Sequence, residues 1–88
     1  MNNVEKHKLI CDVLNNLYER KNQDYGDSFS KGFEEYGLTM SCIRLEDKLN
    51  RLKSLEKNGV AAVSDESVVD TLLDLANYSI MTIMELQD

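Results

Sequence analysis

The sequence contains no proline and only 4 glycines among its 88 residues. These two residue types end helices and form tight turns, so a chain that nearly lacks them has few places at which to turn. No segment shows sustained alternation of apolar and polar residues, the pattern of a half-buried strand. We therefore expect an all-α fold built from long helices.

Basic residues are also scarce: 10 lysines and arginines face 16 acidic residues, giving a net charge of -6. This charge disfavours binding to nucleic acid or to an anionic membrane. The two cysteines, Cys11 and Cys42, form no disulfide framework, and we expect them to be reduced and to act as small core groups. The N-terminus has no apolar run typical of a signal peptide. We expect a cytoplasmic protein (in the host cytoplasm if phage-encoded) that binds neither nucleic acid nor membrane.

Turn and capping residues divide the chain into three long helices and one short one. Asn2, followed by Glu5, predicts the start of a first helix that ends near residues 21–22. Residues 28–36 form a short helix or structured loop closed by Gly37. Thr39 caps a third helix that runs to residues 58–59. After a connector at residues 60–63, Ser64 or Asp65 caps a fourth helix ending near residue 86. We expect one domain over residues 1–88.

The fourth predicted helix is apolar around most of its circumference, which indicates burial from several directions. An 88-residue chain buries only roughly 60% of its unfolded surface, so an isolated monomer is marginal. We therefore expect a small antiparallel helical bundle that is completed by oligomerisation, as a homodimer or homotetramer.

Acidic side chains form a stripe on this fourth helix. At ~100° per residue, Glu66, Asp70 and Asp74 lie on one side, together with Asn77. Like charges one turn apart repel each other, and a divalent cation would reverse the sign of that interaction. Two interpretations remain open: a metal-binding stripe, or a solvated acidic face beside the core.

The third predicted helix carries oxygen ligands beside a basic edge, in the segment RLEDKLNR (residues 44–51). Glu46 and Asn50 lie one turn apart, whereas Arg44, Lys48 and Arg51 share another face. A metal-bound polyphosphate needs both kinds of group, because a metal and basic side chains divide the phosphate charge. The alternative is an ordinary solvated helix face.

Three segments resemble a known family: Asp47-Lys48 flanked by Arg44 and Arg51, DESVVDTLLDLANYSIM (residues 65–81) and KNQDYGDSF (residues 21–29). They resemble the phage and bacterial nucleotide modification associated domain family. That family is similar to the all-α nucleoside triphosphate pyrophosphatases of the MazG-like and dimeric dUTPase superfamily. The resemblance covers residues 21–86 approximately.

The resemblance implies Mg²⁺-dependent (or Mn²⁺-dependent) hydrolysis of a nucleoside triphosphate to a nucleoside monophosphate and pyrophosphate. The implied metal ligands are Asp47, Asn50, Glu66, Asp70 and Asp74. The implied catalytic residues are Glu46 as general base, with Lys48 and Arg51 neutralising phosphate. The implied substrate-binding residues are Lys21, Asn22, Tyr25, Phe29 and Arg44. Helical spacing pairs Glu46 with Asn50, whereas the resemblance favours Asp47, and both alternatives are kept.

The sequence departs from the superfamily's metal motifs at two positions. Asn50 places an amide where a carboxylate is expected, and Thr71 stands where a glutamate is expected. These departures favour an alternative function, a non-catalytic helical oligomer that binds nucleotides or another protein. For Tyr25 and Phe29, packing against the core is an equal alternative to stacking on a base, and for Tyr78 packing is preferred.

Overall fold

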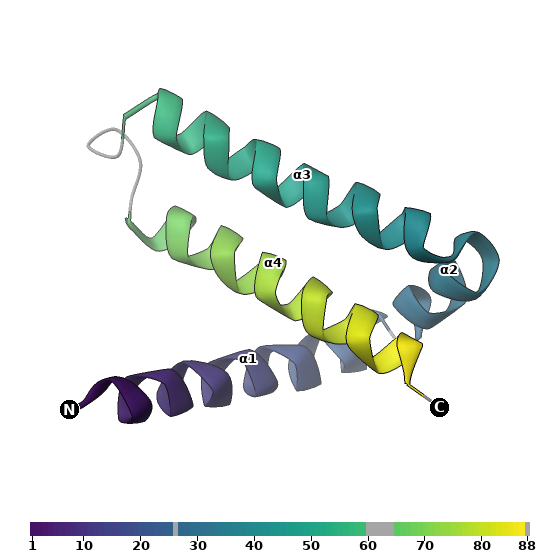
Figure 1. The fold of residues 1–88 in the computed structure, drawn as a ribbon, viewed down its shortest axis with the longest axis horizontal. Helices are drawn as coiled ribbons and strands as arrows, with labels where there is room; N and C mark the ends of the chain where they lie inside the picture. The colour runs from purple at the N-terminus through teal and green to yellow at the C-terminus, as the bar shows by residue number, and fades with distance from the viewer. Residues whose placement is uncertain (26, 60–64, 88) are drawn as a thin grey trace.

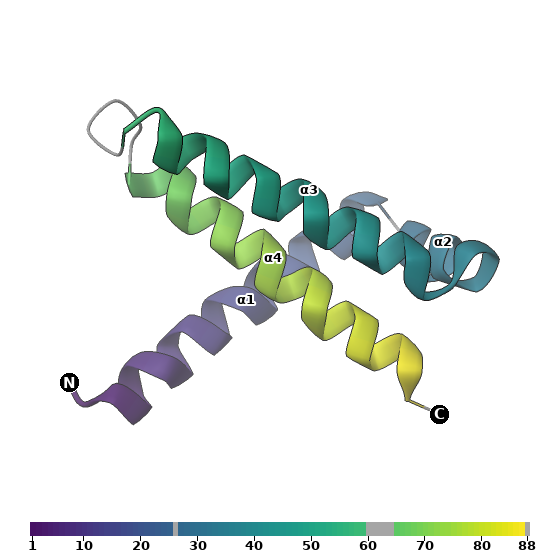
Figure 2. The ribbon, with the colours of Figure 1, turned by 45° about the horizontal axis from the view of Figure 1, so that its top comes forward.

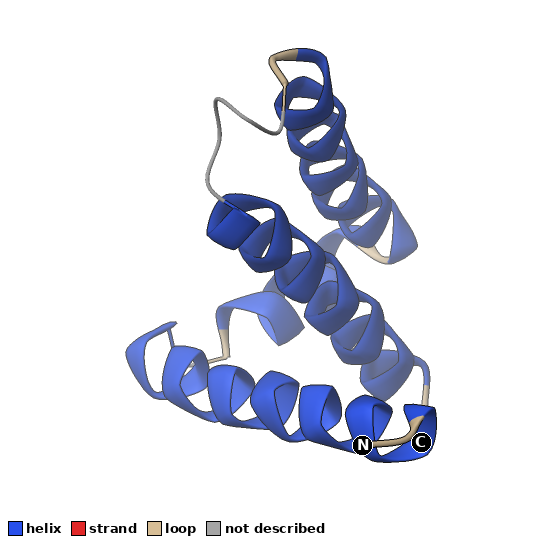
Figure 3. Ribbon diagram, turned by 90° about the vertical axis from the view of Figure 1, so that its left-hand side faces the viewer, coloured by secondary structure: helices blue, strands red, loops and turns tan. Residues whose placement is uncertain are grey.

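The computed structural model describes residues 1–25, 27–59 and 65–87, and for residues 24, 25, 65 and 66 it describes the backbone alone. This part of the chain forms four helices, α1 (Asn3–Tyr25), α2 (Ser28–Tyr36), α3 (Leu38–Lys57) and α4 (Asp65–Leu86) (Figure 1). The described residues contain no strand (Figure 3). The predicted all-α class, with three long helices and one short one, is confirmed.

The helix ends follow local chemistry. Asn2 caps α1, because its Oδ1 accepts a hydrogen bond from the backbone N–H of Glu5 at 2.8 Å. Gly37, at φ 66°, ends α2 and donates its N–H to Phe33 O at 2.7 Å. Gly59, at φ 87°, follows the end of α3. Both glycines adopt a left-handed backbone that side chains with a Cβ disfavour.

Two predicted boundaries are wrong. Helix α1 continues to Tyr25 instead of ending at residues 21–22, because neither glycine nor proline interrupts it before Gly26. Helix α3 begins at Leu38, with Gly37 at the N-cap position, so Thr39 lies inside the helix and is not its cap. The predicted connector at residues 60–63 and the predicted cap at Ser64 lie outside the described residues.

Helix α4 is the central helix of the fold, with α3 on one side of it and α1 on the other (Figures 1 and 3). Helices α3 and α4 run antiparallel, whereas α1 crosses α4 obliquely (Figure 2). Because α4 is covered from two directions, it needs apolar residues around most of its circumference. This placement accounts for the apolar residues that face α1 and α3.

Small polar residues line the contacts of α4. Thr82 Oγ1 is hydrogen-bonded to Ser41 Oγ of α3 at 2.8 Å and donates to Tyr78 O at 2.7 Å. On the other side, Asn77 Nδ2 donates to Leu14 O of α1 at 3.2 Å. All of these side chains find hydrogen-bond partners, so their burial is not penalised. Asn77, predicted in the acidic stripe, therefore joins α1 to α4.

The apolar interior is small. Among the described residues, only Leu14 and Met40 are fully buried hydrophobic side chains. Cys11 and Cys42 are exposed, so the prediction that they are core groups is wrong. Their exposure follows from the arrangement, since α1 packs mainly on α4 and Cys42 lies away from the α4-facing side of α3. No helix in the described part of the chain is long and apolar enough to cross a membrane.

A continuous apolar face remains uncovered on the outside of α4. It consists of Val69, Leu72, Ile80 and Ile83, all exposed, although Ile80 also borders α1, and we call it the outer face of α4. At ~100° per residue these four side chains lie within about 80° of one another. A stripe of this kind is typical of a helix that packs against another helix.

The chain exposes more surface area than a compact monomer of its mass. The chain exposes 6779 Å², whereas a monomeric protein of its mass exposes about 5,300 Å². The excess of roughly 1,500 Å² is about twice the ~800 Å² that each partner buries in a standard interface. The radius of gyration, 14.5 Å, likewise exceeds the about 12 Å of a compact domain of this length. We propose that a second copy of the chain covers the outer face of α4.

Light scattering coupled to size exclusion tests this proposal. We expect a dimer or tetramer at micromolar concentration, and we expect Leu72→Glu to shift it toward the monomer, because a buried unpaired charge opposes association. Lys57→Glu, at an exposed polar position in the last turn of α3, is the matched control and should leave the mass unchanged. A monomeric wild-type chain would contradict the proposal.

Candidate functional site

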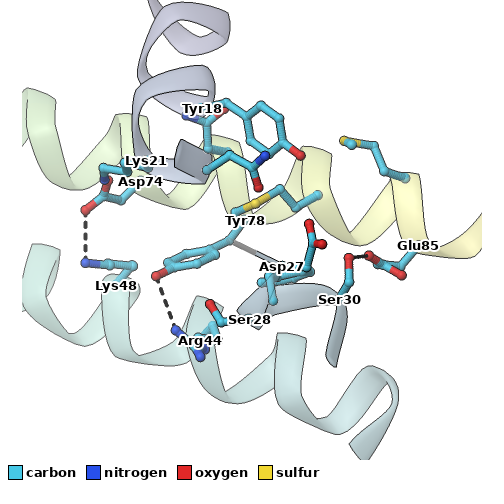
Figure 4. A pocket seen from close by; sticks show the side chains of 15 residues that line it. Tyr18, Lys21, Asp27, Ser28, Ser30, Arg44, Lys48, Asp74, Tyr78 and Glu85 are labelled. Carbon is cyan, nitrogen blue, oxygen red and sulfur yellow. Dashed lines mark hydrogen bonds and ion pairs between the residues drawn. The ribbon is translucent and has the colours of Figure 1, made fainter. Parts of the chain in front are cut away.

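A cavity of about 510 Å³ lies where the four helices meet (Figure 4). Ligand pockets of roughly 300–1,000 Å³ hold small molecules such as nucleotides. Every helix contributes side chains to it, among them Lys21 from α1, Phe29 from α2, Lys48 from α3 and Tyr78 from α4. We call it the central cavity.

An ion-pair cluster forms one end of the central cavity. Each carboxylate oxygen of Asp74, in α4, forms an ion pair with a different lysine. Lys21 Nζ lies 2.6 Å from Oδ1, and Lys48 Nζ lies 3.0 Å from Oδ2. Arg44 lines the same cavity. Lys21 and Lys48 thus pair with one carboxylate, and together with Arg44 these groups carry a surplus of two positive charges. We call Lys21, Arg44, Lys48 and Asp74 the cationic end.

The two lysines determine the charge state of Asp74. Partial burial by itself would raise the pKa of this carboxyl group, but the hydrogen bonds and positive charges of Lys21 and Lys48 outweigh burial and lower the pKa below its ordinary value of 3.8. Asp74 is therefore ionised at neutral pH. Since its partners come from α1 and α3, one carboxylate connects three helices.

Aromatic rings form the wall next to the cationic end. The rings of Phe29 and Tyr78 are stacked, with centroids 6.0 Å apart and an interplanar angle of 20°. Arg44 Cζ lies 5.7 Å from the centroid of the Tyr78 ring, and Lys48 Nζ lies 6.0 Å from it. Arg44 Nη1 is also 3.5 Å from the Tyr78 hydroxyl oxygen, at the long end of hydrogen bonding. Flat rings beside cations suit a ligand that joins a planar group to an anion.

The opposite end of the central cavity carries acidic side chains. Asp27, Ser30 and Glu85 line it, and we call these three residues the acidic end (Figure 4). Ser30 Oγ donates a hydrogen bond to Glu85 Oε1, which connects α2 to the last turn of α4. Asp27 precedes α2 at its N-cap position, but its side chain makes no capping hydrogen bond.

The structure brings together most of the substrate-binding residues predicted from the sequence. Four of them line the central cavity with Lys48, namely Lys21, Asn22, Phe29 and Arg44. The side chain of Tyr25 lies outside the described residues. Arg51 does not line the cavity: its Nε donates to Thr71 Oγ1 at 3.2 Å, and Thr71 donates in turn to Ser67 O at 2.8 Å.

The predicted metal ligands are more dispersed. Glu46, Asp47 and Asn50 are exposed on α3, and Asp70 is exposed on α4. Glu46 and Asn50 lie two residues on either side of Lys48, about 200° around the helix, so they face away from the cavity of their own chain. The side chain of Glu66 is not among those described. Among the side chains that are described, no three His, Cys, Asp or Glu residues form a metal-binding group.

Sequence reasoning missed several residues of the cavity. Tyr78 was expected to pack between helices, but it lines the cavity, and Met81 and Glu85 do so too. These three follow Asp74 by four, seven and eleven residues, which places all four on one side of α4. That spacing was the available signal. Asp27 and Ser30 had no comparable pattern, because they lie at a helix start whose placement depends on tertiary contacts.

Asp74→Asn tests the stabilising role of the ion pairs. The pKa of Asp74 is lower in the folded state than in the unfolded state, so the ionised carboxylate stabilises the fold above the unfolded value of 3.8. This contribution disappears as the pH falls through the folded-state pKa. We expect Asp74→Asn to destabilise the fold at pH 7 by at most ~1 kcal/mol, the upper end for water-exposed ion pairs.

Urea denaturation between pH 2 and 7 measures this effect. The difference between wild type and Asp74→Asn should shrink below about pH 4. Asp70→Asn, one turn earlier and exposed, is the control and should change stability little at any pH. A difference between wild type and Asp74→Asn that does not vary with pH would contradict the ion-pair account.

Comparison with known proteins identifies the family. The pattern of the family described as nucleotide modification associated domain 1 matches residues 21–86, the range over which the sequence resembles that family. No curated protein and no solved structure matches the chain. The matched range includes α2, α3 and α4, together with the Lys21 end of α1 that reaches the central cavity. The chain belongs to the nucleotide modification associated domain 1 family.

Proposed function

We propose that the central cavity binds a nucleoside triphosphate and that the chain, with Mg²⁺ or Mn²⁺, hydrolyses it to a nucleoside monophosphate and pyrophosphate. The observation that carries the proposal is the cationic end lying beside the stacked Phe29 and Tyr78 rings. The family of the chain is associated with nucleotides. Similarity to the MazG-like pyrophosphatases is part of this proposal.

The cationic side chains would bind the phosphates by exchanging partners. Lys21 and Lys48 now share one carboxylate, Asp74, and both remain partly exposed, Lys21 by half. A triphosphate carries more negative charge than one carboxylate and offers more oxygens, so both lysines gain by turning to it. Arg44 reaches the same region and offers a planar group with several donors.

The base would lie against the aromatic wall. Tyr78 is half-buried and stacked on Phe29, so one flat apolar surface is already formed before a ligand enters. A preformed wall saves the conformational entropy that binding otherwise loses. The distance from this wall to the cationic end is short, because Lys48 Nζ and the Tyr78 ring centroid are 6.0 Å apart. One ligand can therefore contact both.

The carboxylates of α4 are the residues that would hold a divalent cation. Asp70 and Asp74 lie one turn apart on the same side of the helix, and carboxylate oxygen is the ligand that Mg²⁺ prefers. Glu66 and Asp47 are further proposed ligands, whereas Glu46 as general base and Asn50 as ligand face away from the cavity of their own chain. The cation would neutralise phosphate charge and lower the pKa of a water molecule.

The reaction is a substitution at the α-phosphorus. The oxygen of a water molecule forms a bond to this phosphorus, and the bond to the bridging oxygen of the pyrophosphate group breaks. The water loses its proton to solvent or to a base, and pyrophosphate leaves with the electron pair. Lys21, Arg44 and Lys48 would stabilise the charge that develops on the leaving group.

A second function has its own support. Asp74 is held by two lysines, and the described residues contain no three-carboxylate group. Asn50 and the buried Thr71 stand where the superfamily has carboxylates. These observations favour a domain that binds a nucleotide without hydrolysing it.

An assay with a panel of deoxynucleoside triphosphates and Mg²⁺ or Mn²⁺ tests the proposal. We expect pyrophosphate release from at least one triphosphate. Binding of a triphosphate without any release would instead support the non-catalytic function. Absence of both binding and release would contradict the proposed nucleotide site.

Lys48→Met should weaken triphosphate binding about tenfold or more, because hydrogen bonds to charged groups contribute roughly 1.5–3 kcal/mol. Lys53→Met is the matched control, since Lys53 is exposed on the same helix and lies about 140° away from Lys48 around it. Isothermal titration calorimetry measures both affinities. Equal losses in the two variants would indicate a non-specific charge effect and contradict a role for Lys48 in the site.

A further inference from the structure

The charge of the central cavity changes from one end to the other. On the side of α4 that lines it, Asp74, Tyr78, Met81 and Glu85 follow one another at spacings of four, three and four residues. At 1.5 Å per residue, about 16 Å of helix separates Asp74 from Glu85. The series runs from a carboxylate neutralised by lysines, through an aromatic ring and a thioether, to a carboxylate without a lysine partner among the described residues.

The two ends differ in charge, and the pair of Lys48 and Asp74 lies on the opposite side of Tyr78 from Glu85 (Figure 4). The cationic end has a surplus of positive charge. The acidic end has two carboxylates, Asp27 and Glu85, and the Ser30 hydroxyl donates to Glu85. A phosphate group would therefore be attracted to the first end and repelled from the second. The orientation of a bound nucleotide follows: phosphates toward Lys21 and Lys48, base past Tyr78 toward Glu85.

Ionised carboxylates only accept hydrogen bonds. The base edge that meets the acidic end must therefore present donors. Cytosine and adenine carry an exocyclic amino group, whereas uracil and thymine carry a carbonyl oxygen at the corresponding position. A carbonyl oxygen facing Asp27 and Glu85 would place acceptor against acceptor, and both groups would lose the hydrogen bonds they make with water.

We propose that the acidic end selects nucleotides of cytosine or adenine, whose exocyclic amino group stands where uracil and thymine, or guanine, carry a carbonyl oxygen, with Glu85 as the main specificity-determining residue and Asp27 as a second acceptor. This inference rests on the proposed nucleotide site and goes beyond it by naming the class of base. Glu85 is the stronger candidate because Ser30 holds its carboxylate in place, so its position is set before a ligand binds. Asp27 is exposed and makes no capping hydrogen bond.

Calorimetry of four deoxynucleoside monophosphates in EDTA tests the inference on the wild-type chain. We expect dCMP or dAMP to bind at least tenfold more tightly than dTMP and dUMP. The affinities of dCMP and dAMP, compared with each other, show whether the site prefers an amino group on a pyrimidine or on a purine. Pyrophosphate, which has no base, serves as the reference ligand for the cationic end.

Glu85→Gln separates recognition from structure. The glutamine side-chain oxygen still accepts the hydrogen bond from Ser30, while its NH₂ group offers a donor to a carbonyl oxygen. We expect the variant to bind dCMP and dAMP about as tightly as dTMP and dUMP, and to bind pyrophosphate with unchanged affinity. Ser30→Ala removes the hydrogen bond that positions Glu85 but keeps the carboxylate, so it should reduce the preference without abolishing it. Glu34→Gln, on the exposed surface of α2, is the matched control for charge.

The outcomes are distinct. Equal binding of all four monophosphates, with normal pyrophosphate binding, overturns the inference and leaves the proposed nucleotide site intact. Absence of binding by pyrophosphate and by every nucleotide overturns both. If Glu85→Gln does not fold, as judged by circular dichroism, Glu85→Met replaces it: a lost preference in that variant supports the inference, and an unchanged preference overturns it.

Discussion

The pairing of Asp74 with Lys21 and Lys48 links the packing of the helices to the proposed site. It joins α1, α3 and α4 through one side chain, in a chain whose described part fully buries only two apolar residues. The same three groups, together with Arg44, form the cationic end of the central cavity. A fold with so small an interior uses polar contacts, here the ion pairs and the hydrogen bonds of Asn77 and Thr82, to position its helices. Stability and the proposed site therefore share the same residues.

Much of the fold could be predicted from the sequence, because its signals are local. Asn2 specifies a helix start, and Gly37 and Gly59 specify helix ends, through contacts within a few residues. The family pattern also lies in contiguous segments. The site depends instead on distant pairs. Lys21 and Lys48 lie 53 and 26 residues from Asp74, and helical periodicity does not indicate which lysine faces which carboxylate.

The rotation of α3 about its own axis was the feature that periodicity predicted least well. Helical spacing places Glu46 and Asn50 one turn apart, and both are predicted site residues, a candidate general base and a candidate metal ligand. In the structure, Lys48 and Ser41 face α4, while Glu46, Leu49 and Asn50 are exposed. Long lysine stems and small hydroxyl side chains can occupy a helix contact as well as leucine can. The exposed leucines and the outer face of α4 are then available to a second copy.

The most direct test of the account is the binding of pyrophosphate, without metal, to wild type and to Asp74→Asn. If the lysines that neutralise Asp74 are the phosphate site, removing the carboxylate charge frees them, and the account predicts that Asp74→Asn binds pyrophosphate more tightly than wild type. Calorimetry at low ionic strength measures the difference. Weaker binding by Asp74→Asn, or binding by neither protein, would contradict the account.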